Sequence, residues 1–325
     1  MQTLIDFDRA PVFAIPTVEP IAGITVREGM LLEGPQGWGE FSPLPWESSP
    51  TRWLTAATEP GTVGWPDPVR GRVRVAVTVP AVEPERARGI AASSGCRTAA
   101  VEVGTGDPAD DVDRIRAVRD GLGPGGIVRC NARGRWDVEA AVAAITSLDR
   151  AAGGLEFVTQ PCRTRDELAA VRRRVDVPVA IAAGATHGDP ALPVEHCADI
   201  AVLVCGPSGG VRRALRFAES CGLPCMVGSS LETTIGLAAG VALAGALPHL
   251  PFACELGTRE LLAGDLVAES RSLSAGDGCL PVAPMPPAPQ PELLDRYAVT
   301  DPDRVAFWRD RLHAARTAAR ANGSG

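Results

Sequence analysis

The sequence contains no lysine, since all 32 of its basic residues are arginine. A GC-rich genome favours arginine codons and would explain part of this bias. The chemical consequence holds whatever the cause. Without lysine the chain can form no Schiff base, and it has neither a P-loop lysine nor a lysine general base. Any proton transfer or anion binding must use other side chains.

Aromatic residues and long apolar runs are also scarce. Aromatics make up 4% of the chain, so the core must be built from Val, Leu, Ile and Ala. No apolar stretch reaches the roughly 18 residues of a membrane span, and the N-terminal MQTLIDFDRAPVF lacks the pattern of a signal peptide. The net charge of −7 opposes binding to nucleic acid. We expect a cytoplasmic protein that binds neither nucleic acid nor membranes.

The nine cysteines and four histidines do not form a metal motif. An odd number of cysteines in a long chain without a secretion signal predicts reduced thiols. Cys221 and Cys225 lack a matching second pair, so we interpret them as packing residues. The glycine-rich GLGPGG at 121–126 follows a predicted helix and precedes a strand, the reverse of a dinucleotide site. These features predict no cofactor.

From about Arg72 onward, short β-branched runs alternate with amphipathic helical segments. The helical spacing is clear in Val112, Ile115, Val118 and Leu122. At least seven such β/α units favour a closed parallel barrel, and an open doubly wound sheet is the alternative. The predicted strands are VRVAVTVPA, AAVEV, IVRCN, LEFVT, VPVAI, IAVLV and LPCMVG.

The two ends of the chain differ from this repeat. Residues 1–72, which include WGEFSPLPWESSP, predict a separate α+β capping domain over the barrel mouth, and residues 73–282 form the barrel. Residues 283–325 begin with a Pro-rich linker and end in a helix. In that helix Val305, Trp308 and Leu312 share one face.

Several segments closely resemble the actinobacterial o-succinylbenzoate synthases of the enolase superfamily. The resemblance covers nearly the whole chain and is carried by GITVREGMLLEG, GWGEFSP, DRAAGGLEFVTQPCRTRDELAAVRRRVDVPVA, SGGVRRALRFAESCGLP and SSLETTIGLAAGVALAGALP. It implies an α/β fold, a modified (β/α)7β TIM-like barrel with an N-terminal α+β capping domain. It also implies dehydration of a cyclohexadiene carboxylate with a divalent metal and lysine acid/base groups.

The family's metal ligands do not appear at the matching positions. The third strand should end in Asp, with Asn two residues later, but here the residues are Asn131 and Arg133. Thr159 replaces a Glu before Gln-Pro, and Ala182 with Ala183 replaces an Asp-Glu. Magnesium prefers hard oxygen ligands that usually include carboxylates. We therefore expect no metal.

The family's lysines are absent too. The second-strand Lys-x-Lys reads Ala100, Val101 and Glu102, and the sixth-strand Lys is Val204. Because neither metal nor lysine remains to stabilise an enolate, we predict no o-succinylbenzoate synthase activity. The predicted helices, turns and packing segments nevertheless keep their regular sequence patterns. This favours a protein that is kept folded for another purpose.

Two hypotheses follow. The first is a repurposed, metal-independent lyase, isomerase or cyclase acting on a small carboxylated or polyketide-like metabolite; the second is an inactive pseudoenzyme that binds a ligand or partner. Either way the expected partner is a small molecule in the barrel mouth. The candidate catalytic residues are Glu102 as acid or base, Arg133 as an anion clamp and Asn131 as a hydrogen-bond partner. The candidate substrate-binding residues are Thr159, Ser229, Ser230, Arg27 and Trp46.

Thiol catalysis is a further alternative, because Cys130 and Cys205 each neighbour a replaced position. Strand alternation argues against it. If Asn131 and Val204 point into the barrel, both thiols point outward into the helix layer. His187 is the one histidine that follows a predicted strand end.

Overall fold

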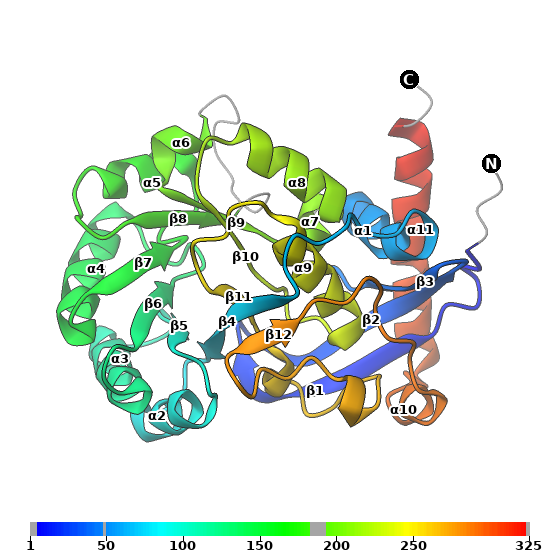
Figure 1. Cartoon of the computed structure of the whole chain (residues 1–325), viewed down its shortest axis with the longest axis horizontal. Coiled ribbons are helices and arrows are strands. Elements are labelled where there is room, and N and C mark those ends of the chain that lie inside the picture. Colours follow the sequence, from blue (N-terminus) through cyan, green and yellow to red (C-terminus); the bar gives the residue numbers. More distant parts are fainter. Residues whose placement is uncertain (1–4, 48–49, 183–192, 323–325) are drawn as a thin grey trace.

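The computed structural model describes residues 5–47, 50–182 and 193–322. Within these ranges, eight parallel strands form the barrel, in the hydrogen-bonded order β10-β9-β8-β7-β6-β5-β4-β11. A bridge between Gly228 and Glu255 joins the two ends of this sheet, so the barrel nearly closes (Figure 1). The strands are β4 (Arg72–Val79), β5 (Thr98–Glu102), β6 (Ile127–Asn131), β7 (Leu155–Thr159), β8 (Val179–Ala182), β9 (Ile200–Leu203), β10 (Cys225–Val227) and β11 (Cys254–Gly257).

Helices follow the first seven barrel strands and surround the sheet. Local signals set their ends: Asp107 and Asp137 cap α3 and α4 with their side chains, and Thr164 forms a capping box with Glu167 at the start of α5. This confirms the predicted (β/α)7β barrel over the open sheet. The helices are α2 (Pro84–Ser93), α3 (Pro108–Leu122), α4 (Val138–Ala152), α5 (Arg165–Arg172), α6 (Val194–Cys197), α7 (Cys205–Ser208), α8 (Val211–Ser220) and α9 (Thr234–Ala246).

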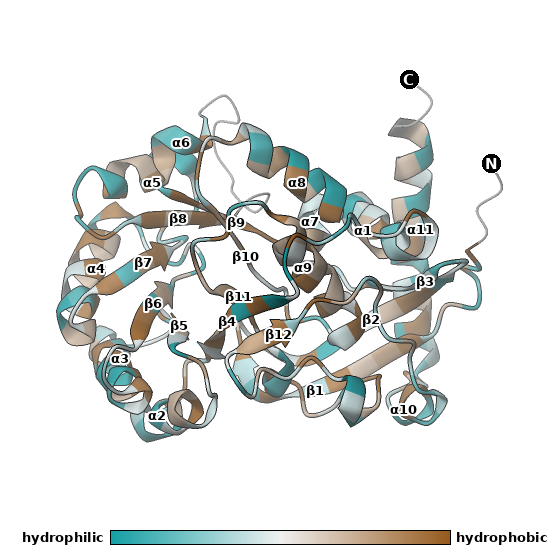
Figure 2. Cartoon of the chain, in the orientation of Figure 1, coloured by the Kyte–Doolittle hydropathy of each residue, from teal (hydrophilic) through white to brown (hydrophobic). Residues whose placement is uncertain are grey.

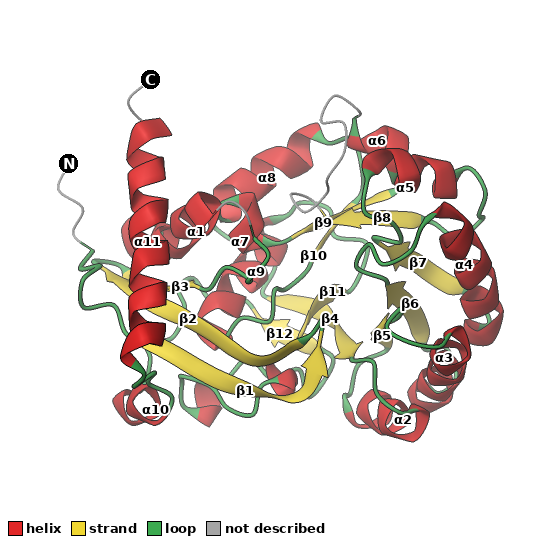
Figure 3. Ribbon diagram, turned by 180° about the vertical axis from the view of Figure 1, so that it is seen from behind, coloured by secondary structure: helices red, strands yellow, loops and turns green. Residues whose placement is uncertain are grey.

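An antiparallel sheet and a helix form the N-terminal cap beside the barrel (Figure 3). The sheet consists of β1 (Val12–Ile21), β2 (Ile24–Gly34) and β3 (Gly37–Phe41), and α1 (Pro50–Thr62) packs against β3. The turn at Ala22 and Gly23 adopts positive φ angles of 52° and 79°, as a tight hairpin requires. This turn brings the tip of the hairpin to the mouth of the barrel.

The C-terminal segment returns to the cap. After β12 (Cys279–Pro281), which pairs antiparallel with β4, come the short helix α10 (Pro291–Arg296) and the long helix α11 (Pro302–Asn322). Trp308 and Leu312 of α11 are buried in a cluster with residues of the cap, and Val305 packs against it. The predicted terminal helix and its apolar face are therefore confirmed. The single-turn 3-10 helices lie at Arg259–Leu261 and Glu269–Arg271.

The main core lies between the barrel strands and their helices. Figure 2 shows apolar residues concentrated on the strands and hydrophilic residues on the surrounding helices. Cys130 and Cys205 belong to this outer core, as strand alternation predicted. Burial raises the pKa of both thiols, which opposes thiolate formation. No helix in the described ranges combines the length and apolarity needed to cross a bilayer.

Candidate functional site

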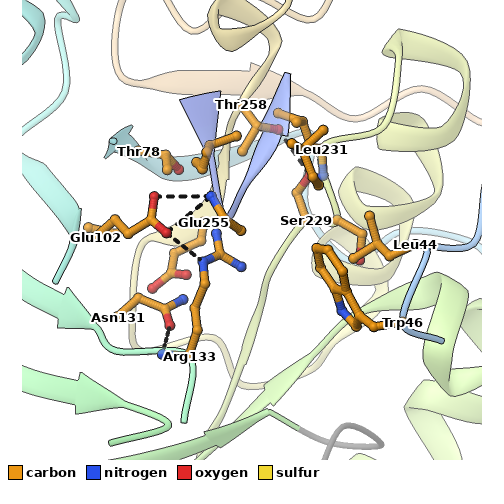
Figure 4. Close-up of a pocket in the computed structure, with 15 residues that line it drawn as sticks. Leu44, Trp46, Thr78, Glu102, Asn131, Arg133, Ser229, Leu231, Glu255 and Thr258 are labelled. Atoms are coloured by element: carbon orange, nitrogen blue, oxygen red, sulfur yellow. Dashed lines mark hydrogen bonds and ion pairs between the residues drawn. The ribbon is translucent and has the colours of Figure 1, made fainter. Parts of the chain in front are cut away.

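A pocket lies at the carboxyl ends of the barrel strands, the end where barrel enzymes place their active sites (Figure 4). Its polar side is formed by residues that include Glu102, Arg133 and Glu255, and Trp46 and Leu44 of the cap lie opposite. The cavity volume is about 60 Å³. Because a water molecule needs roughly 10–15 Å³ by this measure, the pocket as it stands holds a few waters, and a larger ligand requires a side chain to move.

Glu102 is the most heavily bonded carboxylate of the pocket. It ends β5, and its side chain is 3% exposed. Arg135 Nη2 approaches its Oε1 at 2.6 Å, and Arg133 Nε lies 3.5 Å from the same oxygen. The backbone N–H of Ala22 also donates to it, at 3.1 Å to Oε1 and 3.3 Å to Oε2. Glu102 and Arg133 therefore form an ion pair, and Glu102 also ties the cap hairpin to the barrel.

Arg133 reaches the pocket from the loop after β6. Its φ angle is 52°, an uncommon value for a residue with a side chain, and Asn131 Oδ1 accepts its backbone N–H at 3.1 Å. Asn131 therefore acts through the backbone, where it stabilises the turn that aims Arg133. The Arg133 side chain is 35% exposed, so its guanidinium can be reached from the cavity.

Ser229 and Ser230, two of the candidate substrate-binding residues, line the pocket on the loop after β10. Ser229 Oγ donates to Glu232 Oε2 at 2.6 Å and lies 2.9 Å from Thr258 Oγ1. The backbone N–H of Ser230 donates to the same Glu232 oxygen at 2.8 Å. Glu232 thus fixes the serine loop. Trp46, which is 56% exposed, lies on the same side of the pocket as Ser229, across from Glu102 and Arg133 (Figure 4).

Two of the predicted substrate-binding residues do not line this pocket. Arg27 is 2% exposed, and its guanidinium donates to Ser42 and to the carbonyl of Leu231, so it joins the cap to the serine loop. Thr159 is 2% exposed inside the barrel, and its Oγ1 has no hydrogen-bond partner in the described chain. Ala183 and His187, which were discussed from the sequence, lie outside the described residues.

Three charged residues of this region were not identified as candidates from the sequence. Arg135 stands two residues after the predicted Arg133, and Glu255 lies on β11, a four-residue strand that was not among the predicted ones. Arg129 lies in the middle of a predicted strand, IVRCN, and is 0% exposed. A charged residue within an otherwise apolar strand was the feature of the sequence that could have identified it. A buried arginine in the middle of a strand implies a partner carboxylate.

The described residues at the strand ends do not fit a divalent cation. Asn131 and Thr159 offer neutral oxygens, Ala182 offers none, and the Glu102 carboxylate is engaged by two guanidinium groups. In the described ranges, no group of three or more His, Cys, Asp and Glu side chains is arranged to hold a metal. The pocket itself offers an anionic ligand the partly exposed guanidinium of Arg133.

Comparison with known proteins identifies the family. Residues 83–286 match the Enolase C-terminal domain-like family, and residues 12–60 match the Enolase N-terminal domain-like family. The o-succinylbenzoate synthase of Thermobifida fusca is 50% identical over 314 residues, which is 94% of this chain and 95% of that protein. The o-succinylbenzoate synthase of Mycolicibacterium smegmatis is 42% identical over 94% of this chain and 95% of that protein.

Solved structures support the same fold. The muconate lactonizing enzyme from Pseudomonas putida superimposes with a TM-score of 0.74 at 20% identity, covering 91% of this chain and 99% of that chain. The L-Ala-D/L-Glu epimerase from Bacillus subtilis gives a TM-score of 0.72 at 21% identity, covering 88% and 98% of the two chains.

These relatives correct the functional prediction made from the sequence. That prediction expected a repurposed metal-independent enzyme or an inactive binding protein, and no o-succinylbenzoate synthase activity. Relatives at 40–50% identity over nearly the full chain, all named o-succinylbenzoate synthase, overturn it. The prediction rested on the differences from the family's pattern that the resemblance implied at the strand ends. It did not consider Glu255, a buried carboxyl group that lines the same pocket as Arg133.

The two family matches and the near-full-length relatives show that this chain belongs to the enolase superfamily, in its o-succinylbenzoate synthase-like branch.

Proposed function

We propose that this chain forms o-succinylbenzoate by dehydrating a hydroxylated cyclohexadiene carboxylate in the pocket at the barrel mouth. The observation that carries the proposal is the 50% identity to an o-succinylbenzoate synthase over 94% of the chain. Such identity extends through both the cap and the barrel, the two parts that together enclose the pocket.

The chemistry of the ligand agrees with the charges of the pocket. By its name o-succinylbenzoate carries two carboxylates, one on the ring and one on the succinyl chain. A guanidinium binds a carboxylate through two parallel hydrogen bonds. Arg133, partly exposed to the cavity, is the residue that we assign to one of these carboxylates.

Arg133 can change partner without leaving Glu102 unpaired. Its Nε lies 3.5 Å from Glu102, whereas Arg135 lies at 2.6 Å and the Ala22 N–H at 3.1 Å. When Arg133 turns to an incoming carboxylate, Glu102 keeps its two shorter contacts. The same rotation vacates space in the small cavity, because Arg133 lines it.

Other groups of the pocket complete the binding site. Leu44, Trp46 and Leu231 provide an apolar surface that suits a six-membered carbon ring. A guanidinium paired with the ring carboxylate also holds the ring in one orientation in the pocket. The lysine-free sequence excludes an amine from the proton transfers, and we route no step through a metal ion.

The direct test is turnover of the cyclohexadiene precursor by the purified chain, followed by the ultraviolet absorbance change on aromatisation. The expected result is enzyme-dependent formation of o-succinylbenzoate, confirmed by mass spectrometry of the product. The assay is run after chelator treatment and again with added magnesium. A rate equal to the uncatalysed rate in both conditions would overturn the proposed function.

A further inference from the structure

The pocket contains one carboxyl group whose contacts leave it available. Glu255 lies on β11, is 9% exposed and lines the pocket (Figure 4). Its Oε1 is buried and has no hydrogen-bond partner in the described chain. A buried, unpartnered carboxyl oxygen is costly for folding, so its presence beside a ligand pocket calls for an explanation.

The arginine nearest to Glu255 is already paired. Arg129 Nη2 lies 2.7 Å from Glu156 Oε2, and its Nη1 donates to the carbonyl of Ala253 at 3.0 Å. Its guanidinium carbon stacks 4.4 Å above the ring of Phe157. The contact from Arg129 Nη1 to Glu255 Oε1 is 3.9 Å, too long for a hydrogen bond.

A β-bulge explains this arrangement. Val128 pairs with Leu155 and Cys130 pairs with Val158, so Glu156 and Phe157 together oppose the single residue Arg129. The extra residue brings the Glu156 carboxylate to Arg129 inside the barrel. Glu156 therefore takes the shorter contact to Arg129, and Glu255 keeps an ion pair of 3.9 Å with it but no hydrogen bond from it.

The protonation of Glu255 follows from these surroundings. Burial raises the pKa of Glu255; the charges of Arg129 and Arg133 oppose this rise, and the charge of Glu156 adds to it. A carboxyl group whose pKa is raised holds its proton closer to neutral pH and can donate it. Glu102, held by Arg135 and the cap hairpin, has no comparable freedom.

We propose that Glu255 is the residue that transfers protons in this pocket, an inference that rests on the proposed dehydration. Glu255 gives its proton to the hydroxyl group of the substrate while the C–O bond breaks. The electron pair of the C–O bond leaves with the oxygen, which departs as water. The Glu255 carboxylate then accepts the proton of the ring carbon next to the carboxylate. The C–H electron pair forms the new ring double bond, and Glu255 returns to its starting state.

The test compares Glu255→Gln with Glu156→Gln, two isosteric changes at carboxylates that face the same arginine. The control Glu156 does not line the pocket. We expect E255Q to lower kcat at least ~100-fold, the usual contribution of a general acid or base. Its Kd for o-succinylbenzoate, measured by calorimetry, should change less than about threefold, which is under 1 kcal/mol. E156Q should keep kcat within about tenfold of the unchanged protein.

The pH profile gives a second readout. Because Glu255 acts first as an acid, kcat of the unchanged protein should fall as pH rises through its raised pKa, and residual activity of E255Q should lack this fall. Full activity of E255Q, or an equal loss in E156Q, would overturn the role of Glu255 and leave the proposed function intact. An unchanged protein without turnover would overturn both.

Discussion

Arg133 is a pocket residue whose position depends on a strained backbone conformation. Its left-handed backbone conformation is stabilised by the Asn131 side chain, and it places the guanidinium over the cavity. Strained backbone is found where the surrounding structure holds a functional group in place. The cation and the acid of the pocket thus come from different strands, Arg133 after β6 and Glu255 on β11.

The first prediction concerns the Arg133 side chain. Arg133→Gln should weaken binding of o-succinylbenzoate ~10-fold to ~100-fold, since a hydrogen bond to a charged group contributes about 1.5–3 kcal/mol. Titration calorimetry measures this. Arg116→Gln, on an arginine whose side chain is 63% exposed on α3, is the matched control and should bind as the unchanged protein does. Equal affinities for all three proteins would remove Arg133 from the binding site.

The second prediction concerns the buried hydroxyl of Thr159. Because Oγ1 has no partner in the described chain, Thr159→Val should leave the free energy of unfolding unchanged or raise it by about 1 kcal/mol. Thr234→Val is the contrasting variant, since its hydroxyl donates to Asp265 at 2.6 Å and accepts the Leu273 N–H at 3.0 Å. That variant should lose roughly 1–3 kcal/mol. Denaturant unfolding compares them, and a large loss in T159V would reveal a partner for the hydroxyl.

At the scale of elements, the spacing of hydrophobic residues predicted seven of the barrel strands, the amphipathic helices between them and the terminal helix α11. Each of these elements buries one apolar face, so apolar residues recur in its sequence at the spacing of a helix or a strand. The strand β11 was missed because its four residues, CELG, are too short for a period. The bulge in β7 could not be predicted either, since the register of two strands depends on their pairing in space.

The cap and the barrel are joined by buried polar contacts at the start of α9. Glu40 of β3 accepts hydrogen bonds from the N–H and hydroxyl of Thr233, at 3.0 and 2.5 Å, and from the Gly236 N–H at 3.2 Å. Ser42 also donates to it, at 2.6 Å. This contact could not be predicted from the sequence, because Glu40 and Thr233 are 193 positions apart and meet only in the folded chain.

The third prediction follows from the pKa of Glu40. Burial raises this pKa to about 7, although Arg27, Ser42 and Thr233 oppose the rise. For an acid whose pKa is raised in the folded state, the folded protein binds more protons than the unfolded one between the two pKa values. Its contribution to the free energy of unfolding therefore falls as pH rises from about 4.5 to about 7, by up to roughly 3 kcal/mol.

Glu40→Gln removes this titration. The difference in unfolding free energy between E40Q and the unchanged protein should therefore vary across that pH range, as measured by denaturant unfolding at several pH values. Glu33→Gln, at an exposed position of β2, is the matched control for the loss of one carboxylate. A constant difference for E40Q would show that Glu40 keeps an ordinary pKa.

At the scale of the whole molecule, the distribution of charge determines one property, the response to divalent metal. The net charge of −7 attracts cations weakly and without a site. A specific site behaves differently, because a ligand that binds the folded state stabilises it by RT ln(1 + [L]/Kd), about 2.7 kcal/mol at a concentration of 100 Kd.

The last prediction is that millimolar magnesium does not raise the Tm of the chelator-treated protein beyond the effect of sodium chloride at equal ionic strength. Asn131 and Thr159 offer neutral oxygens, and the Arg133 guanidinium lies beside Asn131 in the same pocket, where it repels a cation. Differential scanning calorimetry measures both salts. Arg133→Gln serves as the matched variant: if the guanidinium alone excluded the ion, its removal would produce a magnesium-dependent rise in Tm. A rise in the unchanged protein that grows with the logarithm of magnesium concentration would contradict the prediction and require a metal site in this chain.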